Sequence, residues 1–208
     1  MSYEAVRCQR KAKILDSAKN WIARHGIVDT TVNDISKAAN ISRQTFYKYF
    51  SGIDDLVLEV QRGCIRHFML YITDKCSGES SRETLKNILL KLLDFCTEFP
   101  DELNIISVLD SYALNNSSSE DYGKMYAECV LNNKKISEII AWGQNDGEIR
   151  KDADFNVLRS ITVNALIGTA QRFAAVKGML GDAYKMTPAD FINGAFDMIE
   201  SYLAPKNS

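Results

Sequence analysis

Apolar residues recur every three to four positions along most of the chain, which is the period of an amphipathic α-helix. Between residues 11 and 25, for example, Ile14, Ala18 and Ile22 share one face, and lysines occupy the other. No segment alternates apolar and polar residues for long enough to predict a strand. The chain has only three prolines and 11 glycines. We therefore predict an all-α protein of about nine helices.

The boundaries of the predicted helices follow from residues that cap or break helices. Gly26 ends the first helix, Thr31 can cap the second, and Ser42 can cap the third. The segment NNSSSE, residues 115–120, is the most loop-like part of the chain. The predicted helices cover residues 11–25, 32–39, 43–50, 54–76, 82–98, 100–114, 121–142, 154–180 and 189–204. We expect two domains, residues 1–52 with three helices and residues 53–208 with the longer ones.

The second and third predicted helices are joined by a very short turn. Asn40 lies in this turn, and asparagine is one of the few residues that tolerate a left-handed backbone. Polar residues are concentrated on the helix that follows. Two helices joined in this way predict a helix-turn-helix.

The segment ISRQTFYKYF, residues 41–50, includes the third predicted helix and contains no acid. Phe46 and Phe50 share a face at i, i+4 spacing and would anchor the helix, so Gln44 and Lys48 point away from the anchor. Amide, guanidinium, hydroxyl and ammonium groups on one face can donate to phosphates and base edges of DNA. The alternative is an ordinary solvated face, on which lysine and glutamine are also common.

The charge distribution favours a polyanion at the N-terminal end. Residues 1–50 contain nine Lys and Arg against four Asp and Glu, whereas the remainder contains 16 against 23. The five cysteines form no C-x-x-C pair, so we expect neither a disulfide framework, nor a metal site, nor a cofactor. No apolar run approaches the ~20 residues that span a bilayer, and no signal peptide is evident, so we expect a cytoplasmic protein.

The run from Gly26 through TTVNDISKAANISRQTFYKYF to Leu56 resembles the DNA-binding region of the TetR family of bacterial repressors. The resemblance covers about residues 11–58. It departs from the family pattern where Asn40 replaces the usual glycine of the turn, where Ser36 replaces alanine, and where Ile53 replaces a common lysine. The last change removes one expected phosphate contact.

The resemblance implies a homodimer that binds a palindromic operator in double-stranded DNA. The third helices would enter successive major grooves, and a small-molecule effector would bind the helical domain and release a repressor from its operator. Carried over by position, the DNA-contacting residues are Thr31, Asn33, Ser42, Arg43, Gln44, Thr45, Tyr47, Lys48 and Tyr49.

The remainder of the chain supplies weaker signals. A stripe of small residues on the eighth predicted helix and apolar residues on the ninth could form a dimer interface or could pack within one chain. These residues are Ser160, Asn164, Gly168, Phe191, Ala195, Met198, Ile199 and Tyr202. Aromatic and amide residues on helices five to eight could line an effector pocket or belong to the core. These residues are Phe95, Phe99, Tyr112, Tyr126, Trp142, Asn164 and Phe173.

Two other functions remain as alternatives. An enzyme is disfavoured because the chain has no Walker loop and no G-x-G-x-x-G, and because it has only two histidines. Of these, His25 is expected in the core, and His67 has no evident catalytic partner. The second alternative is a helical protein-interaction module that does not bind DNA.

Overall fold

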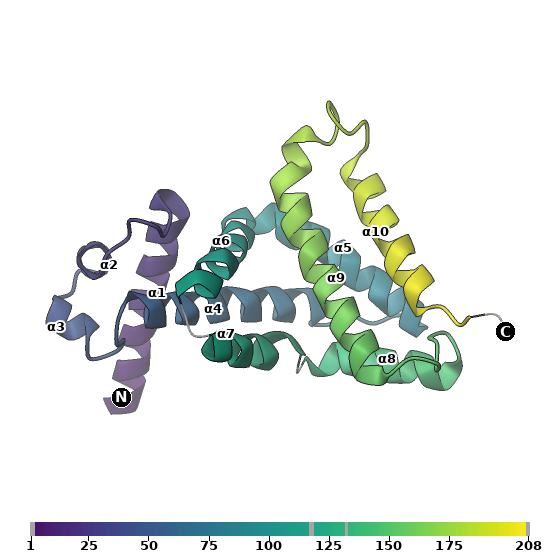
Figure 1. The fold of residues 1–208 in the computed structure, drawn as a ribbon, viewed down its shortest axis with the longest axis horizontal. Coiled ribbons are helices and arrows are strands. Elements are labelled where there is room, and N and C mark those ends of the chain that lie inside the picture. Colours follow the sequence, from purple (N-terminus) through teal and green to yellow (C-terminus); the bar gives the residue numbers. More distant parts are fainter. Residues whose placement is uncertain (1–2, 117–118, 132, 207–208) are drawn as a thin grey trace. The chain divides into compact units, whose positions relative to one another are not determined.

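The computed structural model describes residues 3–116, 119–131 and 133–206. Within them, the chain forms ten α-helices and no strand, which confirms the predicted all-α class (Figure 1). The α-helices are α1 (Tyr3–His25), α2 (Val32–Ala38), α3 (Arg43–Phe46), α4 (Ile53–Thr73), α5 (Ser81–Glu98), α6 (Pro100–Asn116), α7 (Ser119–Tyr126), α8 (Lys134–Asp146), α9 (Phe155–Val176) and α10 (Pro188–Leu203). Two short segments add a π-helix, η1 (Ala127–Leu131), and a 3-10 helix, η2 (Lys177–Met179).

The chain groups into two compact units. The first contains residues 1–65 and 104–126, and the second contains residues 66–103 and 127–208. The predicted domain boundary at residue 52 stays a prediction, because this grouping follows contacts and not function. The helix α4 is shared between the units: its residues up to Ile65 belong to the first unit and those from Arg66 to the second.

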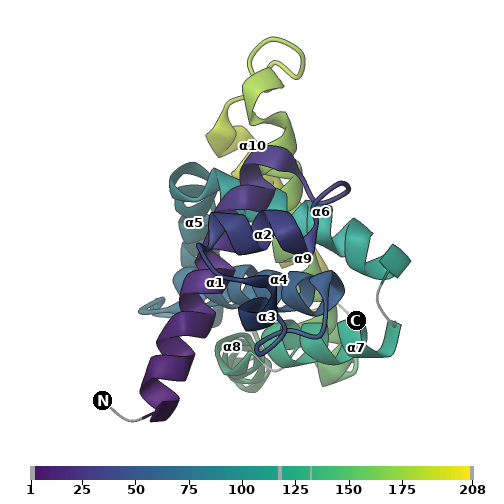
Figure 2. The same ribbon diagram turned by 90° about the vertical axis from the view of Figure 1, so that its left-hand side faces the viewer.

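In the first unit, α1 and α2 pack together and α3 closes the small domain (Figure 2). Ile14 and Ile22 of α1, Ile35 of α2 and Phe46 of α3 are all buried. Burial of such side chains contributes roughly 1.5–3 kcal/mol each. This shared core fixes the position of the very short α3, which has too few backbone hydrogen bonds to be stable alone.

Local signals determine the turn between α2 and α3. Thr31 and Asp34 form a capping box at the start of α2, and the Ser42 hydroxyl accepts a hydrogen bond from the Thr45 amide at the start of α3. Asn40 has a φ of 53°, so it adopts the left-handed conformation expected of it. The predicted helix-turn-helix is thus confirmed at the level of its caps and its turn.

In the second unit, α5 contacts α8, α9 and α10. Gly143 of α8 allows a close approach, since a Cβ at this position would lie 2.5 Å from the Ser81 hydroxyl oxygen and 2.6 Å from side-chain carbons of Ile149. Near the same place, the Ser81 hydroxyl donates to Glu148 at 2.6 Å. This hydrogen bond lowers the pKa of the Glu148 carboxyl, which retains its charge.

Several helix boundaries differ from the prediction. The predicted helix over residues 121–142 is wrong, because it divides into α7, η1 and α8, with the Asn133 side chain capping α8 by accepting from the Ile136 amide. The helix α1 begins at Tyr3, about two turns early. Part of the predicted loop at 115–120 is helical, since α6 reaches Asn116 and α7 starts at Ser119, while positions 117–118 lie outside the described residues.

Candidate DNA-binding surface

The helix α3 is anchored by two aromatic side chains. Phe46 is fully buried and Phe50 nearly so, and their ring centroids lie 5.4 Å apart. The Lys11 ammonium of α1 lies 5.5 Å from the centre of the Phe50 ring and pairs with Glu59 of α4 at 2.9 Å. These contacts join α3 to the helices before and after it, so its opposite face has a fixed direction.

That opposite face is polar and exposed. Arg43, Gln44 and Lys48 are exposed, and Tyr47 retains 50% of its accessible surface. Thr45 and Tyr49 are half-buried at the sides. The structure therefore brings the predicted contact residues of α3 onto one surface in the first unit.

The backbone of this segment tightens after Phe46. The Tyr47 amide still bonds to the Arg43 carbonyl, four residues back, but the amides of Lys48 and Tyr49 bond to carbonyls three residues back. Only Arg43–Phe46 is α-helical, although the chain continues to turn as far as Phe50. Lys48 consequently remains outward even though the regular helix predicted to residue 50 ends earlier.

Two of the predicted contact residues have hydroxyls already engaged in caps. The Thr31 hydroxyl donates to the Asp34 carboxylate at 2.5 Å, so its proton is committed within the domain. Bonds from Thr31 lower the pKa of Asp34 and keep it ionised. The hydroxyls of Ser42 and Thr45 lie 2.9 Å apart, and whichever of them accepts retains its own proton for a ligand.

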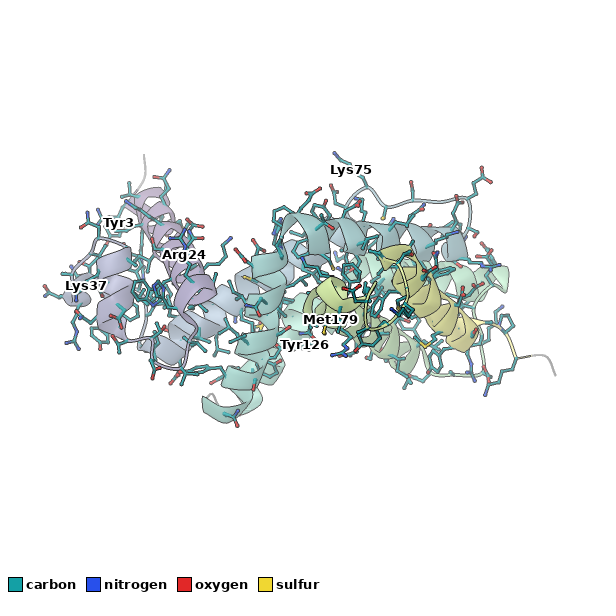
Figure 3. All side chains as sticks on the ribbon, turned by 90° about the horizontal axis from the view of Figure 1, so that it is seen from above. Tyr3, Arg24, Lys37, Lys75, Tyr126 and Met179 are labelled. Atoms are coloured by element: carbon teal, nitrogen blue, oxygen red, sulfur yellow. The ribbon has the colours of Figure 1, made fainter. Side chains whose placement is uncertain are left out.

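The helix α2 adds residues to this surface. Asn33 is exposed, as predicted by the resemblance. Lys37 is also exposed and points away from α2 (Figure 3). Lys37 was not among the contact residues predicted from the sequence. The available signal was its positive charge in the last turn of α2, next to the turn of the predicted motif.

The predicted pocket residues are divided between the two compact units. In the second unit, Phe95 and Phe99 stack at 5.0 Å beside His67, whose Nδ1 lies 2.8 Å from a Glu102 carboxylate oxygen. Phe173 is buried with its ring 5.6 Å from that of Phe191. Trp142 is half-buried on α8, and the exposed Asn164 donates its side-chain amide to the Ser160 carbonyl at 2.8 Å.

The other two predicted pocket residues lie in the first unit. The Tyr112 hydroxyl donates to Asp54 at 2.8 Å, and Tyr126 packs beside Tyr122 with ring centroids 6.1 Å apart. Burial raises the pKa of both predicted pocket tyrosines to about 12, with a further contribution from the carboxylate near each. The effector pocket therefore stays a prediction.

Most of the predicted dimer residues line a single groove. A groove of about 710 Å³ lies along α9 and α10, and its lining is predominantly apolar. Met198, which lines this groove, is 71% exposed. Ser160 and Asn164 are not part of the lining. The predicted residues that line the groove are Gly168, Phe191, Ala195, Met198, Ile199 and Tyr202.

The placement of His25 differs from the prediction. It is exposed, with its ring stacked on Trp21 at 3.9 Å and its Nδ1 3.0 Å from the Trp21 carbonyl oxygen. The helical wheel placed it beside the apolar face, but α1 ends there and Gly26 turns the chain away.

Among the described residues, no group of three or more His, Cys, Asp and Glu could hold a metal ion. No helix in the described ranges is long and apolar enough to cross a membrane.

The fold and this exposed surface define a helix-turn-helix DNA-binding transcriptional regulator. Residues 14–60 match the family model of bacterial regulatory proteins of the tetR family. The chain is 23% identical over 189 residues to the probable acrEF/envCD operon repressor of Escherichia coli K12, with 89% of this chain and 85% of that protein covered. It is 35% identical over 81 residues to the transcriptional repressor KstR2 of Rhodococcus jostii, with coverage of 38% and 40%.

Solved structures agree with this fold. A TetR family transcription regulator from Marinobacter aquaeolei superposes with a TM-score of 0.67 at 20% identity, covering 98% of this chain and 100% of that one. FadR from Bacillus subtilis, solved in complex with stearoyl-CoA, also gives a TM-score of 0.67, at 18% identity with coverage of 92% and 98%. Residues 14–60 thus match the DNA-binding region of the tetR family, and the solved structures show that the whole chain shares the fold of such regulators.

Proposed function

We propose that this protein is a repressor that binds a palindromic operator as a homodimer and leaves it when a small-molecule effector binds the helical body. The proposal depends above all on one observation: Arg43 and Gln44 of α3 and Lys48 in the turn after it are exposed, whereas Phe46 is buried. The names of the Escherichia coli and Rhodococcus relatives, both repressors, support repression over activation.

The exposed groups divide by chemistry into base readers and phosphate binders. The Gln44 amide can make a bidentate contact with adenine, and the Arg43 guanidinium can make one with guanine. Lys48 and the Tyr47 hydroxyl suit phosphates, as do the exposed Asn33 and Lys37 of α2. Thr31 acts mainly by holding α2, because its hydroxyl proton is bound to Asp34.

The apolar groove along α9 and α10 supports homodimerisation through these two helices. Two copies related by a two-fold axis can each cover the groove of the other, and a palindromic operator requires the same symmetry. Replacement of the exposed Met198 with glutamate should produce monomers in sedimentation experiments without unfolding the chain. Glutamate in place of Leu70, which is 65% exposed on α4, provides the control and should leave the dimer intact.

Effector release requires a ligand that prefers a conformation in which the two α3 helices are misspaced. The helix α4 is the natural lever, because it is continuous from Ile53 to Thr73 and belongs to both compact units. The complex of FadR with stearoyl-CoA supports a ligand-binding role for this kind of helical body. Stearoyl-CoA is therefore a first probe, and tight binding that leaves operator affinity unchanged would exclude it as the inducer.

The test of DNA binding uses a duplex selected from a random pool and fluorescence anisotropy with the full chain. Affinity should fall steeply with salt, since counterions are released from DNA on binding. Lys48→Ala should weaken binding to all sequences, whereas Gln44→Ala should relax the preference at one base pair by roughly 1–3 kcal/mol. If neither variant changes affinity or base preference, the helix-turn-helix has another role, and a protein-interaction module becomes the better account.

A further inference from the structure

The helix α1 extends well beyond the domain that it helps to form. Its first buried residue is Ile14, and no side chain from Tyr3 to Lys13 is buried in the structure. Tyr3 is 84% exposed and Val6 42%. Figure 2 shows the N-terminal part of α1 running clear of α2 and α3, and Figure 3 places Tyr3 at its tip.

This extension is cationic. Residues 3–13 contain Arg7, Arg10, Lys11 and Lys13, against the single acid Glu4. Lys11 is neutralised by Glu59 at 2.9 Å. The other three cations are exposed, and none makes an ion pair with a residue that the structure describes.

The geometry of the helix directs part of this charge toward the DNA-binding domain. Arg7 lies one turn before Lys11 and two turns before Ile14, so all three share a face. Lys11 on this face contacts Phe50 and Glu59. Arg7 therefore points to the same side of the helix as Lys11, about 6 Å further out along the helix axis. Arg10, three residues after Arg7, lies beside it.

A helical overhang of this kind has no packing of its own to stabilise it, because the stability of short helices in proteins comes mainly from tertiary contacts. The projecting residues 3–10 are about 12 Å long. Double-stranded DNA carries one negative charge per ~1.7 Å of its axis, so a duplex seated on α3 continues past the domain as a line of phosphates. The extension and α3 belong to the same compact unit, so a duplex that α3 binds is held at a fixed position relative to the extension.

We propose that the exposed end of α1, residues 3–13, is a second DNA-contacting element that binds backbone phosphates flanking the bases contacted by α3. This inference depends on the proposed function of the helix-turn-helix. The contact is electrostatic and independent of base sequence, and Arg7, Arg10 and Lys13 supply it.

The test compares Arg7→Ala/Arg10→Ala with Lys86→Ala/Lys134→Ala, which removes the same charge from exposed positions in the second unit. On the selected duplex, the α1 variant should bind about tenfold more weakly at 0.15 M salt, and its salt dependence should fall by about 0.9 for each lost contact. The control should match the natural protein. Circular dichroism should be unchanged for both, since no buried side chain is replaced.

Two further arms separate the possible causes. Arg7→Lys/Arg10→Lys retains both charges and should restore affinity, because the proposed contact depends on charge. Shortening the duplex so that only the selected bases remain should weaken the natural protein but not the Arg7→Ala/Arg10→Ala variant. Equal affinity and equal salt dependence of this variant and the natural protein would overturn the proposal.

The outcomes also distinguish this inference from the function on which it depends. If the natural protein enriches no sequence and binds no duplex, the proposed function itself fails. If the Arg7→Ala/Arg10→Ala variant keeps full DNA affinity but loses binding to phosphatidylserine vesicles that the natural protein binds, the extension serves a membrane surface and the DNA proposal is wrong.

Discussion

Truncation of Phe46 to alanine tests whether one buried ring holds the DNA-contacting surface in place. The side chain is fully buried, with the Phe50 ring at 5.4 Å and the Tyr47 ring at 5.5 Å. The helix α3 has a single regular turn, Arg43–Phe46, so it has little stability of its own. Loss of the ring leaves a cavity in the small domain and removes the anchor of the segment.

The expected cost of Phe46→Ala is about 3–5 kcal/mol, the usual range for a phenylalanine in a packed core. Domains have total stabilities of only about 5–15 kcal/mol, so this loss is a large fraction of what is available. This loss corresponds to an increase of roughly 10²- to 4 × 10³-fold in the population of the opened state, at 1.4 kcal/mol for each factor of ten. Phe46→Leu, which conserves more volume, should cost less than about 1.5 kcal/mol.

Hydrogen exchange on the full chain measures this effect where it occurs, because amides report the local free energy of opening. Peptides covering residues 32–50 should exchange faster in Phe46→Ala, and the same variant should lose its affinity for the operator. Gln44→Ala on the outer face is the matched control, with unchanged exchange but weakened binding. A loss below ~1 kcal/mol in Phe46→Ala, or faster exchange in Gln44→Ala, would refute the assignment of inner and outer faces.

Four further substitutions test stability and ionisation. Gly143→Ala should destabilise the chain by roughly 1–3 kcal/mol in urea unfolding, because the new Cβ meets atoms at 2.5–2.6 Å. Gly63→Ala, with open space at its Cβ, should instead stabilise it by up to about 1 kcal/mol. The lowered pKa of Asp34 makes its contribution to stability present above its ordinary pKa and lost as pH falls through the folded value; Thr31→Val should raise this pKa in carboxyl NMR titrations. The pKa of Tyr112, raised to about 12, makes its contribution present below the ordinary value near 10 and lost between about pH 10 and 12; Tyr112→Phe should flatten this alkaline decline in unfolding experiments.

Features of the fold that depend on neighbouring residues were predictable from the sequence. The caps at Thr31 and Ser42 and the left-handed turn at Asn40 follow from side-chain chemistry within three or four positions. The inward direction of Phe46 follows from helical spacing and is confirmed by its burial. The exposed surface could be predicted for the same reason, because it lies on the side opposite the Phe46 and Phe50 side chains.

Features that depend on tertiary packing were not predictable in the same way. The cationic start of α1 has no apolar periodicity, so the sequence placed the beginning of the helix too late. The apolar pattern over 121–142 reads as one helix, so it did not reveal that a separate helix, α8, begins at Lys134. The π-helical segment η1 changes the helical periodicity before Asn133 caps α8. The aromatic residues chosen for a pocket lie in two separate units, and periodicity cannot show which helices share a cavity.

Selection of bound duplexes from a random DNA pool with the full-length protein tests the central claim most directly. Two outward-facing α3 helices in a symmetric dimer predict an enriched palindrome whose half-sites lie about one helical turn apart. Gln44→Ala should change the enriched base at one position in each half-site. A pool that shows no enriched sequence after repeated rounds, or one whose enriched sequence is unaffected when Arg43, Gln44 and Lys48 are all replaced by alanine, would contradict the account.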